Sequence, residues 1–165
     1  MTEECNCESK DHYHPKIRLI QFMDDTERIL SKKCEPVTEM TKEIDELIED
    51  MRATMHAFNG LAIAAPQIGK SLQIIVINKA IYDKEEEDLV IINPEIVSLS
   101  GDKKLDMEFC LSFPIGKYKE RYEEVEIKCK NRKMENAIIF EDTPMKSKVL
   151  QHEIDHLNGI TLLDD

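Results

Sequence analysis

The feature that most constrains how this chain can fold is a histidine pair near its end. His152 and His156 stand four residues apart, and Glu153 directly follows the first of them. On a helix this spacing places both imidazoles on one face, one turn apart, where they can bind the same metal ion. In this H-E-x-x-H pattern the glutamate moves protons for a metal-bound water. The sequence therefore predicts a helix that carries a metal site. The alternative is an ordinary polar helix with solvated histidines.

A catalytic site of this kind needs a third protein ligand and one open coordination position. One common extension of the pattern supplies a histidine six residues after the second, but Leu162 occupies that position here. Only Asp164 and Asp165 follow as possible ligands, and they lie at the chain end, so we expect an upstream ligand. Cys110 is the favoured candidate. Its rival, Cys129, lies in an alternating apolar pattern typical of a buried strand.

Length, charge and cysteine usage exclude several classes of protein. A chain of 165 residues is sufficient for one domain with a real core. The formal net charge of −12 would repel phosphates, so we expect no direct nucleic-acid partner. No apolar run has the length of a membrane span and no signal peptide is recognisable, so we expect a cytoplasmic protein without a membrane partner. The five dispersed cysteines favour reduced thiols over a disulfide framework.

The polar start of the chain differs from the rest. We expect residues 1–16 to form a flexible N-terminal tail and residues 17–165 to form a single catalytic domain. Cys5, Cys7, His12 and His14 in this tail could bind a metal ion. A disordered polar end is the favoured interpretation of this segment.

Two helices are predicted, one at each end of the domain. Apolar residues recur at three- and four-residue steps over 41–58, which indicates an amphipathic helix that begins at Thr38 or Thr41. Thr143 followed by Pro144 predicts the start of the histidine-bearing helix.

The strands are predicted to lie between these helices. This order favours an α+β fold, with mainly antiparallel sheets around a central C-terminal metal-binding helix. We expect loops or turns over 25–37, 60–69 and 100–102. Strands are expected over 72–77, 89–92, 96–99, 125–129 and 137–140, and residues 93–94 should separate the second of these strands from the third.

Three stretches together resemble the motifs of the peptide deformylase family. Gly60–Gln67 is similar to the motif Gly-x-Gly-x-Ala-Ala-x-Gln, and Glu108–Ser112 is similar to Glu-Gly-Cys-Leu-Ser. Gln151–Gly159 matches Gln-His-Glu-x-Asp-His-x-x-Gly in full. The third motif is shared in part with many metalloproteases, whereas the three in this order are specific. The resemblance extends over residues 17–163.

The resemblance implies a fold, an activity and a metal. The expected fold is that of the deformylases, and the expected reaction removes the formyl group from the N-terminal formyl-methionine of newly made polypeptides. Cys110, His152 and His156 would hold one divalent metal ion. The family favours Fe²⁺ in the cell, and a thiolate with two imidazoles also suits Zn²⁺, Ni²⁺ or Co²⁺.

The resemblance also assigns roles around the metal. A metal-bound water would attack the formyl carbon, with Glu153 as general base and then general acid. The Gln67 side chain and the Leu111 backbone N–H would stabilise the charge that develops on the formyl oxygen. Gln151 and Asp155 are candidates for orienting the histidines or the metal water, and Asp155 is equally compatible with a plain surface carboxylate.

The expected substrate-binding residues are Gly60, Leu61, Ala62, Ile63 and Phe109, which would lie along two walls of a cleft. Two of them depart from the family pattern, because Ala62 and Phe109 replace motif glycines. We therefore expect activity on formyl-methionyl peptides, with the Phe109 ring changing the preference at residues beyond the methionine.

The implied partners are N-formylmethionyl peptides and nascent chains. Many bacterial members carry a further C-terminal helix that helps them dock at the ribosome, so any transient ribosome contact here is expected to take another form.

Two other functions remain open. One is a metallopeptidase or amidase of another kind. The other is a protein that binds peptide ends without hydrolysis, which Phe109 favours and the intact Glu153 argues against.

Overall fold

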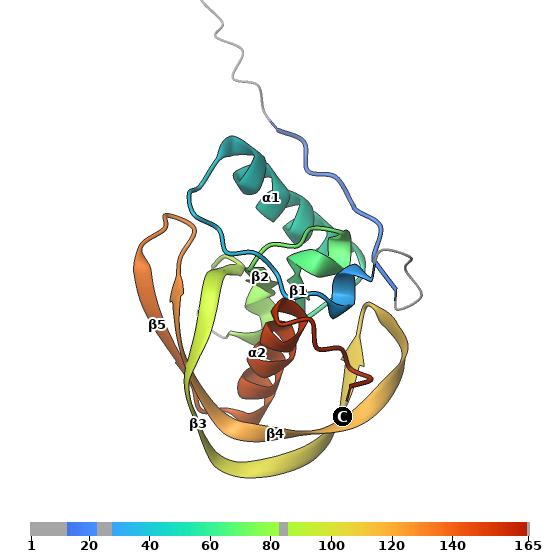
Figure 1. Ribbon diagram of the computed structural model, residues 1–165, viewed down its shortest axis with the longest axis vertical. Helices are drawn as coiled ribbons and strands as arrows, with labels where there is room; N and C mark the ends of the chain where they lie inside the picture. The colour runs from blue at the N-terminus through green and yellow to red at the C-terminus, as the bar shows by residue number, and fades with distance from the viewer. Residues whose placement is uncertain (1–12, 23–27, 83–85, 165) are drawn as a thin grey trace, which may run out of the picture.

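The computed structural model describes residues 13–22, 28–82 and 86–164 (Figure 1). Most of the predicted N-terminal tail, including Cys5, Cys7 and His12, lies outside the described residues. None of the helices within the described ranges is long and apolar enough to cross a bilayer.

Two α-helices and three short 3-10 turns make up the helical part of the described residues. Helix α1 spans Lys42–Ala57, and the side chain of Thr41 accepts a hydrogen bond from the backbone N–H of Ile44, so Thr41 is the cap. Helix α2 spans Pro144–Leu157. Thr143 stands at its N-cap position as predicted, but its side chain makes no capping hydrogen bond. The 3-10 turns are η1 (Ile29–Ser31), η2 (Ala65–Ile68) and η3 (Lys79–Ile81).

One antiparallel sheet of five strands contains all the strands of the described chain, in the order β1-β2-β3-β4-β5. This arrangement with the C-terminal helix confirms the predicted α+β class. The strands are β1 (Ala62–Ala64), β2 (Ile74–Ile77), β3 (Leu89–Cys110), β4 (Phe113–Lys130) and β5 (Asn136–Glu141).

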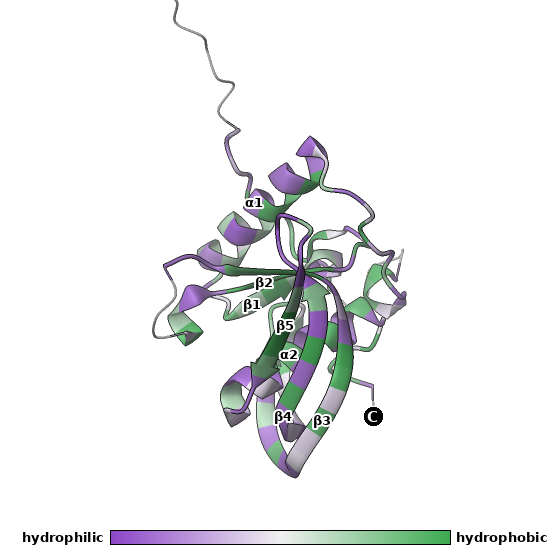
Figure 2. Ribbon diagram, turned by 90° about the vertical axis from the view of Figure 1, so that its left-hand side faces the viewer, coloured by the Kyte–Doolittle hydropathy of each residue, from purple (hydrophilic) through white to green (hydrophobic). Residues whose placement is uncertain are grey.

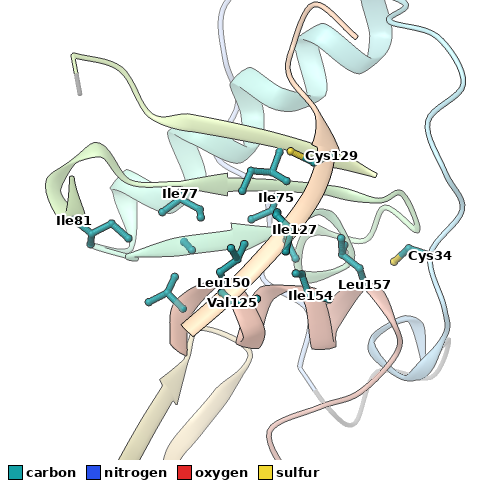
Figure 3. Packing of buried hydrophobic residues seen from close by; sticks show 14 residues of the cluster. Cys34, Ile75, Ile77, Ile81, Val125, Ile127, Cys129, Leu150, Ile154 and Leu157 are labelled. Atoms are coloured by element: carbon teal, nitrogen blue, oxygen red, sulfur yellow. The ribbon is translucent and has the colours of Figure 1, made fainter. Parts of the chain in front are cut away.

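Strand β2 is buried on both faces because a helix covers each of them. Ile74 and Val76 join the apolar cluster beneath α1, whereas Ile75 and Ile77 join the cluster beneath α2. Figure 3 shows the second cluster, where Leu150 of α2 approaches the strands. Side chains alternate between the two faces of a strand, so four consecutive apolar residues pack against both helices, two toward each.

Strands β3 and β4 form a long curved ribbon that wraps around α2 (Figure 1), with alternating hydrophobic and hydrophilic residues along much of its length (Figure 2). The predicted break at 93–94 is wrong, because β3 continues through it with a register shift between Ile92 and Glu95. Asn93 adopts a φ of 50° and exchanges two hydrogen bonds with the backbone of Val37. A bulge accommodates Pro94, which cannot donate a hydrogen bond to a neighbouring strand.

Other boundaries also differ from the predictions. The turn expected at 100–102 is a further bulge in β3, where Gly101 has a φ of 75° and the register shifts between Ser100 and Lys103. The strand expected at 125–129 is only the end of β4. The segment 60–69, expected to be a turn, contains β1 and η2, and η1 lies within the expected loop 25–37.

The C-terminal end of α2 is held against the start of the domain. Gly159 has a φ of 72°, and a Cβ atom there would lie 2.7 Å from the carbonyl carbon of Lys32. The backbone N–H of Cys34 donates a hydrogen bond to the carbonyl oxygen of Leu157, at 2.8 Å. Only glycine suits both this backbone conformation and this close approach, so the packing fixes where the histidine-bearing helix ends.

Candidate metal centre

Cys110 closes β3 and faces the histidine pair of α2. One potential ligand atom from each of Cys110, His152 and His156 lies within 4.8 Å of the other two. The Cys110 Sγ atom is 3.2 Å from Nε2 of His156, and both histidines are buried. A thiolate and two imidazoles are donors that suit Zn²⁺ and related divalent ions. Cys129, the rival candidate, is instead buried in the apolar cluster between the sheet and α2.

A chain of charged groups orients the first histidine. Glu108 accepts a hydrogen bond from Nδ1 of His152 at 2.8 Å, which leaves Nε2 available as a ligand atom. Arg121 of β4 donates two hydrogen bonds to Glu108 and a third to Asp155. Asp155 therefore acts on the histidine only through the arginine and the glutamate.

Burial and pairing give the charged groups at this centre opposite titration behaviour. Burial disfavours the charged form of Glu108, but hydrogen bonds from His152 and Arg121 outweigh it and lower its pKa to about 2. Burial also disfavours a charged His152, yet hydrogen bonds to Cys110 and Glu108 raise its pKa to about 10. A cation bound at this ring would displace its proton. Burial and repulsion from His152 lower the pKa of His156 to about 3, so this second ring is neutral.

Glu153 is buried beside the ligands without a complete set of partners. The residue is 5% exposed, and its Oε2 atom makes no hydrogen bond within the described chain. Burial, with repulsion from Glu108, raises its pKa to about 7. The Nδ1 atom of His156 is likewise buried and without a hydrogen-bond partner among the described residues. Buried polar atoms normally find partners, so the Oε2 atom of Glu153, whose residue lines the cavity beside this centre, is open to a ligand or water.

Gln67 reaches the same centre from η2. Its Oε1 atom accepts a hydrogen bond from the backbone of Ala64, and its Nε2 atom donates to Cys110 Sγ at 3.4 Å and to Ser112 Oγ at 3.3 Å. The amide is thereby fixed with its donor side toward the cysteine. Leu111 follows Cys110 in the turn that joins β3 to β4, so its backbone N–H belongs to the same turn.

A cavity of about 300 Å³ lies beside this centre. Residues around β1 form one wall, β3 forms the opposite wall, and α2 contributes the groups that include His152 and Glu153. A Cβ atom on Gly60 in the first wall would lie 3.0 Å from the side chain of Leu111, so a larger residue there would require that side chain to shift. Lys148 of α2 is a charged lining residue, and its ammonium group pairs with Asp106.

Most of the residues expected to bind substrate line this cavity, namely Gly60, Leu61, Ala62 and Phe109. Ile63 does not, because its side chain is fully buried in the cluster beneath α1. Gln151 faces away from the histidines, since its amide bonds the backbone of Tyr122 and the side chain of Ser147. These bonds connect α2 to β4, and the role of Gln151 in orienting the histidines or the metal water stays a prediction.

Sequence reasoning missed two members of the centre. Glu108 belongs to a recognised motif but received no role, although a carboxylate two residues before a ligand cysteine was available as a signal. Arg121 lies in an alternating polar stretch of β4 where nothing distinguishes it from neighbouring charges. Its place follows from the pairing of β3 with β4, which brings it beside Glu108 and α2.

Comparisons with known proteins point to one family. A sequence model described as polypeptide deformylase matches residues 19–165. The peptide deformylase of Carboxydothermus hydrogenoformans is 42% identical over 82% of this chain and 86% of its own length. Among solved structures, the Legionella pneumophila peptide deformylase superposes with a TM-score of 0.80 and 40% identity, covering 88% of this chain and 83% of that one.

A third relative was solved with a bound compound. The Synechococcus elongatus peptide deformylase in complex with actinonin gives a TM-score of 0.80 at 32% identity, over 93% of this chain and 82% of that one. The family match includes η2, the turn after β3 and helix α2, which together build the centre described above. The chain therefore belongs to the polypeptide deformylase family.

Proposed function

We propose that this chain hydrolyses the formyl group from the N-terminal formyl-methionine of newly made polypeptides. Cys110, His152 and His156 would hold one divalent metal ion for this reaction. The observation that carries the proposal is the position of these three donors beside a buried carboxylate, Glu153, that has an unpartnered oxygen at an apolar cavity. Family membership supports the same reaction.

The residues present fit such an ion on chemical grounds. One thiol and two imidazoles converge, and Glu108 fixes the first ring so that its other nitrogen can bind. When bound, the metal supplies Lewis-acid polarisation of water and of the formyl carbonyl. We propose Fe²⁺ as the ion used in the cell, with Zn²⁺, Ni²⁺ and Co²⁺ as ions that the same donors accept.

Glu153 is the group that moves the proton. As water adds to the formyl carbon, Oε2 of Glu153 accepts a water proton, and it then passes a proton to the nitrogen of the departing methionine. Burial raises the pKa of Glu153 above its ordinary value, which favours uptake of a proton by this carboxylate. The balanced products are formate and a polypeptide with a free amino terminus.

Gln67 and Leu111 stabilise the oxygen of the formyl group. Charge develops on this oxygen when the carbon becomes tetrahedral, and N–H donors held in place beforehand lower the barrier. The amide of Gln67 is held by the backbone of Ala64, so its donor side needs no reorganisation during the reaction. The N–H of Leu111 would act from the turn that also carries Cys110.

The methionine side chain would enter the part of the cavity next to α2. Leu111 and Val149 supply apolar surface there, and an unbranched thioether packs well against such surface. N-formylmethionyl peptides and nascent chains are therefore the proposed partners, with transient contact at the ribosome. We place the protein in the cytoplasm, where polypeptides begin with this group.

The decisive experiment measures formate release from formyl-Met-Ala-Ser, with metal analysis of the same sample. Acetyl-Met-Ala-Ser and unformylated Met-Ala-Ser serve as matched controls, and the protein is loaded anaerobically with Fe²⁺ or, separately, with Zn²⁺ or Ni²⁺. We expect formate from the first peptide only. Cleavage of the Met-Ala bond would instead indicate a metallopeptidase. Binding of the formyl peptide without any formate from any metal form would indicate a binding protein.

A further inference from the structure

We infer that Phe109 selects the side chain of the second residue of the substrate and favours a large apolar one. This inference rests on the proposed function and adds to it a specificity that the metal centre does not determine. Phe109 lines the cavity, yet 77% of the residue is exposed, so its ring is a surface that a ligand can cover.

The faces of β3 explain where this ring points. Glu108 and Cys110 turn toward α2, where they contact His152 and His156. The register of β3 against β4 shifts between Glu108 and Cys110, so the position of Phe109 is taken from its contacts. Its ring lies beside Met107 over Gly116, and Met107 faces opposite to its neighbour Glu108, so the ring points away from α2. The ring therefore borders the cavity on the face opposite to the metal ligands.

Gly116 on the neighbouring strand β4 leaves space for the Phe109 ring. A Cβ atom on Gly116 of β4 would lie 2.8 Å from Cε1 of Phe109 and 2.9 Å from Sδ of Met107. The ring and the thioether therefore lie over the backbone of Gly116, on one face of the ribbon. Any larger residue at 116 would force the ring to move, and the ring would then lose its fixed position at the cavity.

The free edge of β3 determines which substrate residue meets the ring. Beyond Ile92, β3 pairs only with β4 in the described chain, so its other edge offers N–H and C=O groups to an extended peptide. Neighbouring strands point paired side chains to the same face. If the methionine enters the cavity toward α2, the next side chain points to the opposite face, which is the face of Phe109.

The character of this face indicates the preferred side chain. Leu61, on the opposite wall of the cavity, is 50% exposed and adds a second apolar surface. The charged lining residues Glu108, Lys148 and Glu153 belong to the side of the cavity that faces α2. A large apolar side chain would cover both apolar surfaces, whereas an acidic one would lose hydration without gaining a partner.

The test compares peptides of the series formyl-Met-Xaa-Ser, with phenylalanine, leucine, serine or aspartate as the second residue. We expect kcat/KM for phenylalanine to exceed that for serine by about tenfold in the parent, which is at the low end for an apolar contact because the surface is open. In Phe109→Ala the ratio should fall to near one. Leu105→Ala is the matched control, since Leu105 lies on the same face and is 63% exposed but does not line the cavity.

A second variant moves the ring without deleting it. Gly116→Ala should reduce the same ratio, because its methyl group would displace the Phe109 ring. Binding of the unformylated products Met-Phe-Ser and Met-Ser-Ser to the metal-loaded protein, measured by calorimetry, gives a readout independent of turnover. Thermal unfolding of each variant separates loss of selectivity from loss of folded protein.

Several outcomes would overturn the inference. They are a parent that releases formate without preference at the second residue, a preference that survives in Phe109→Ala, and an equal loss in Leu105→Ala. A preference found only in the series formyl-Met-Ala-Xaa would also overturn it, because the alternation argument would then be wrong. Absence of formate from every formyl peptide would instead contradict the proposed function, and the product-binding comparison would still test the role of Phe109.

Discussion

Helices α1 and α2 both bury carboxylates, but they do so in opposite ways. Asp50 of α1 is fully buried and accepts hydrogen bonds from the Tyr13 hydroxyl, the Lys16 backbone and the Arg18 guanidinium. Glu153 of α2 is almost as buried and leaves one oxygen without a hydrogen-bond partner in the described part of the chain. The first carboxylate anchors a segment of the chain to α1, and the second remains available to a substrate.

The titration of the two groups reflects this difference. Burial alone would raise the pKa of Asp50, but the hydrogen bonds from Tyr13, Lys16 and Arg18 lower it below its ordinary value. Burial raises the pKa of Glu153 to about 7. A buried polar atom that lacks a partner costs on the order of 1–3 kcal/mol, so a fold retains such an atom mainly where function requires it. The number of hydrogen-bond partners, rather than burial, separates the structural carboxylate of Asp50 from the proposed catalytic carboxylate of Glu153.

The largest expected effect concerns the metal ligands beside Glu153. Cys110→Ser should lower metal affinity by more than about 100-fold, because even residues that only orient ligands cost 10- to 100-fold. Formate release should fall with it. Cys129→Ser, the matched control, should retain metal and activity, since Cys129 packs in the apolar cluster. Metal analysis after dialysis measures the difference, and loss of metal from the control alone would reverse our ligand assignment.

The next effect isolates the proton-transfer role of Glu153. Glu153→Gln keeps the size of the side chain but cannot accept a proton, so kcat should fall by about 10²- to 10⁴-fold while metal content stays the same. The free energy of unfolding should not decrease, because a neutral amide is easier to bury than a carboxylate. Full turnover in this variant would remove Glu153 from the mechanism.

A smaller loss is expected when one donor to the formyl oxygen is removed. Gln67→Ala should reduce kcat by about 100-fold, which is typical of a single oxyanion donor. Metal content should be unchanged, because the amide contacts Cys110 only through a hydrogen bond of 3.4 Å. If the variant loses its metal, Gln67 supports the ligand rather than the reaction.

Asp50→Asn makes the matched carboxylate-to-amide change on α1 and should act on stability alone. The amide turns a donor toward Tyr13, Lys16 or Arg18, so we expect a loss of about 2 kcal/mol in urea unfolding. Metal content and formate release should match those of the parent. A variant that is as stable as the parent but inactive would break the distinction between the two helices.

The smallest expected effect is the pH dependence of the difference in unfolding free energy between the parent and Asp50→Asn. The pKa of Asp50 is lowered by folding, so its contribution is present above the ordinary aspartate value and is lost as pH falls through the folded-state value. The gap between parent and Asp50→Asn should therefore shrink as pH is lowered from 7 toward 3. Unfolding both proteins in the same metal-loading state measures this gap, and a gap that grows on acidification would contradict the assignment.

The two helices also differ in how far sequence alone could predict their surroundings. The 3.6-residue period placed His152 and His156 on one face, and the same period located α1 to within a residue at each end. The choice between Cys110 and Cys129 was possible because one lies in a distinctive motif and the other in a regular strand pattern. These features depend on residues that are close together in the sequence.

Only the tertiary structure decided what surrounds the helix that carries the histidines. Arg121 reaches Glu108 and Asp155 because the register between β3 and β4, which shifts at several points, brings this one charged side chain beside them. Ile63 turned away from the cavity because both faces of β1 and β2 are covered by helices. A local pattern determines which face of one element is apolar, but the partner of each side chain depends on curvature and register between elements far apart in sequence.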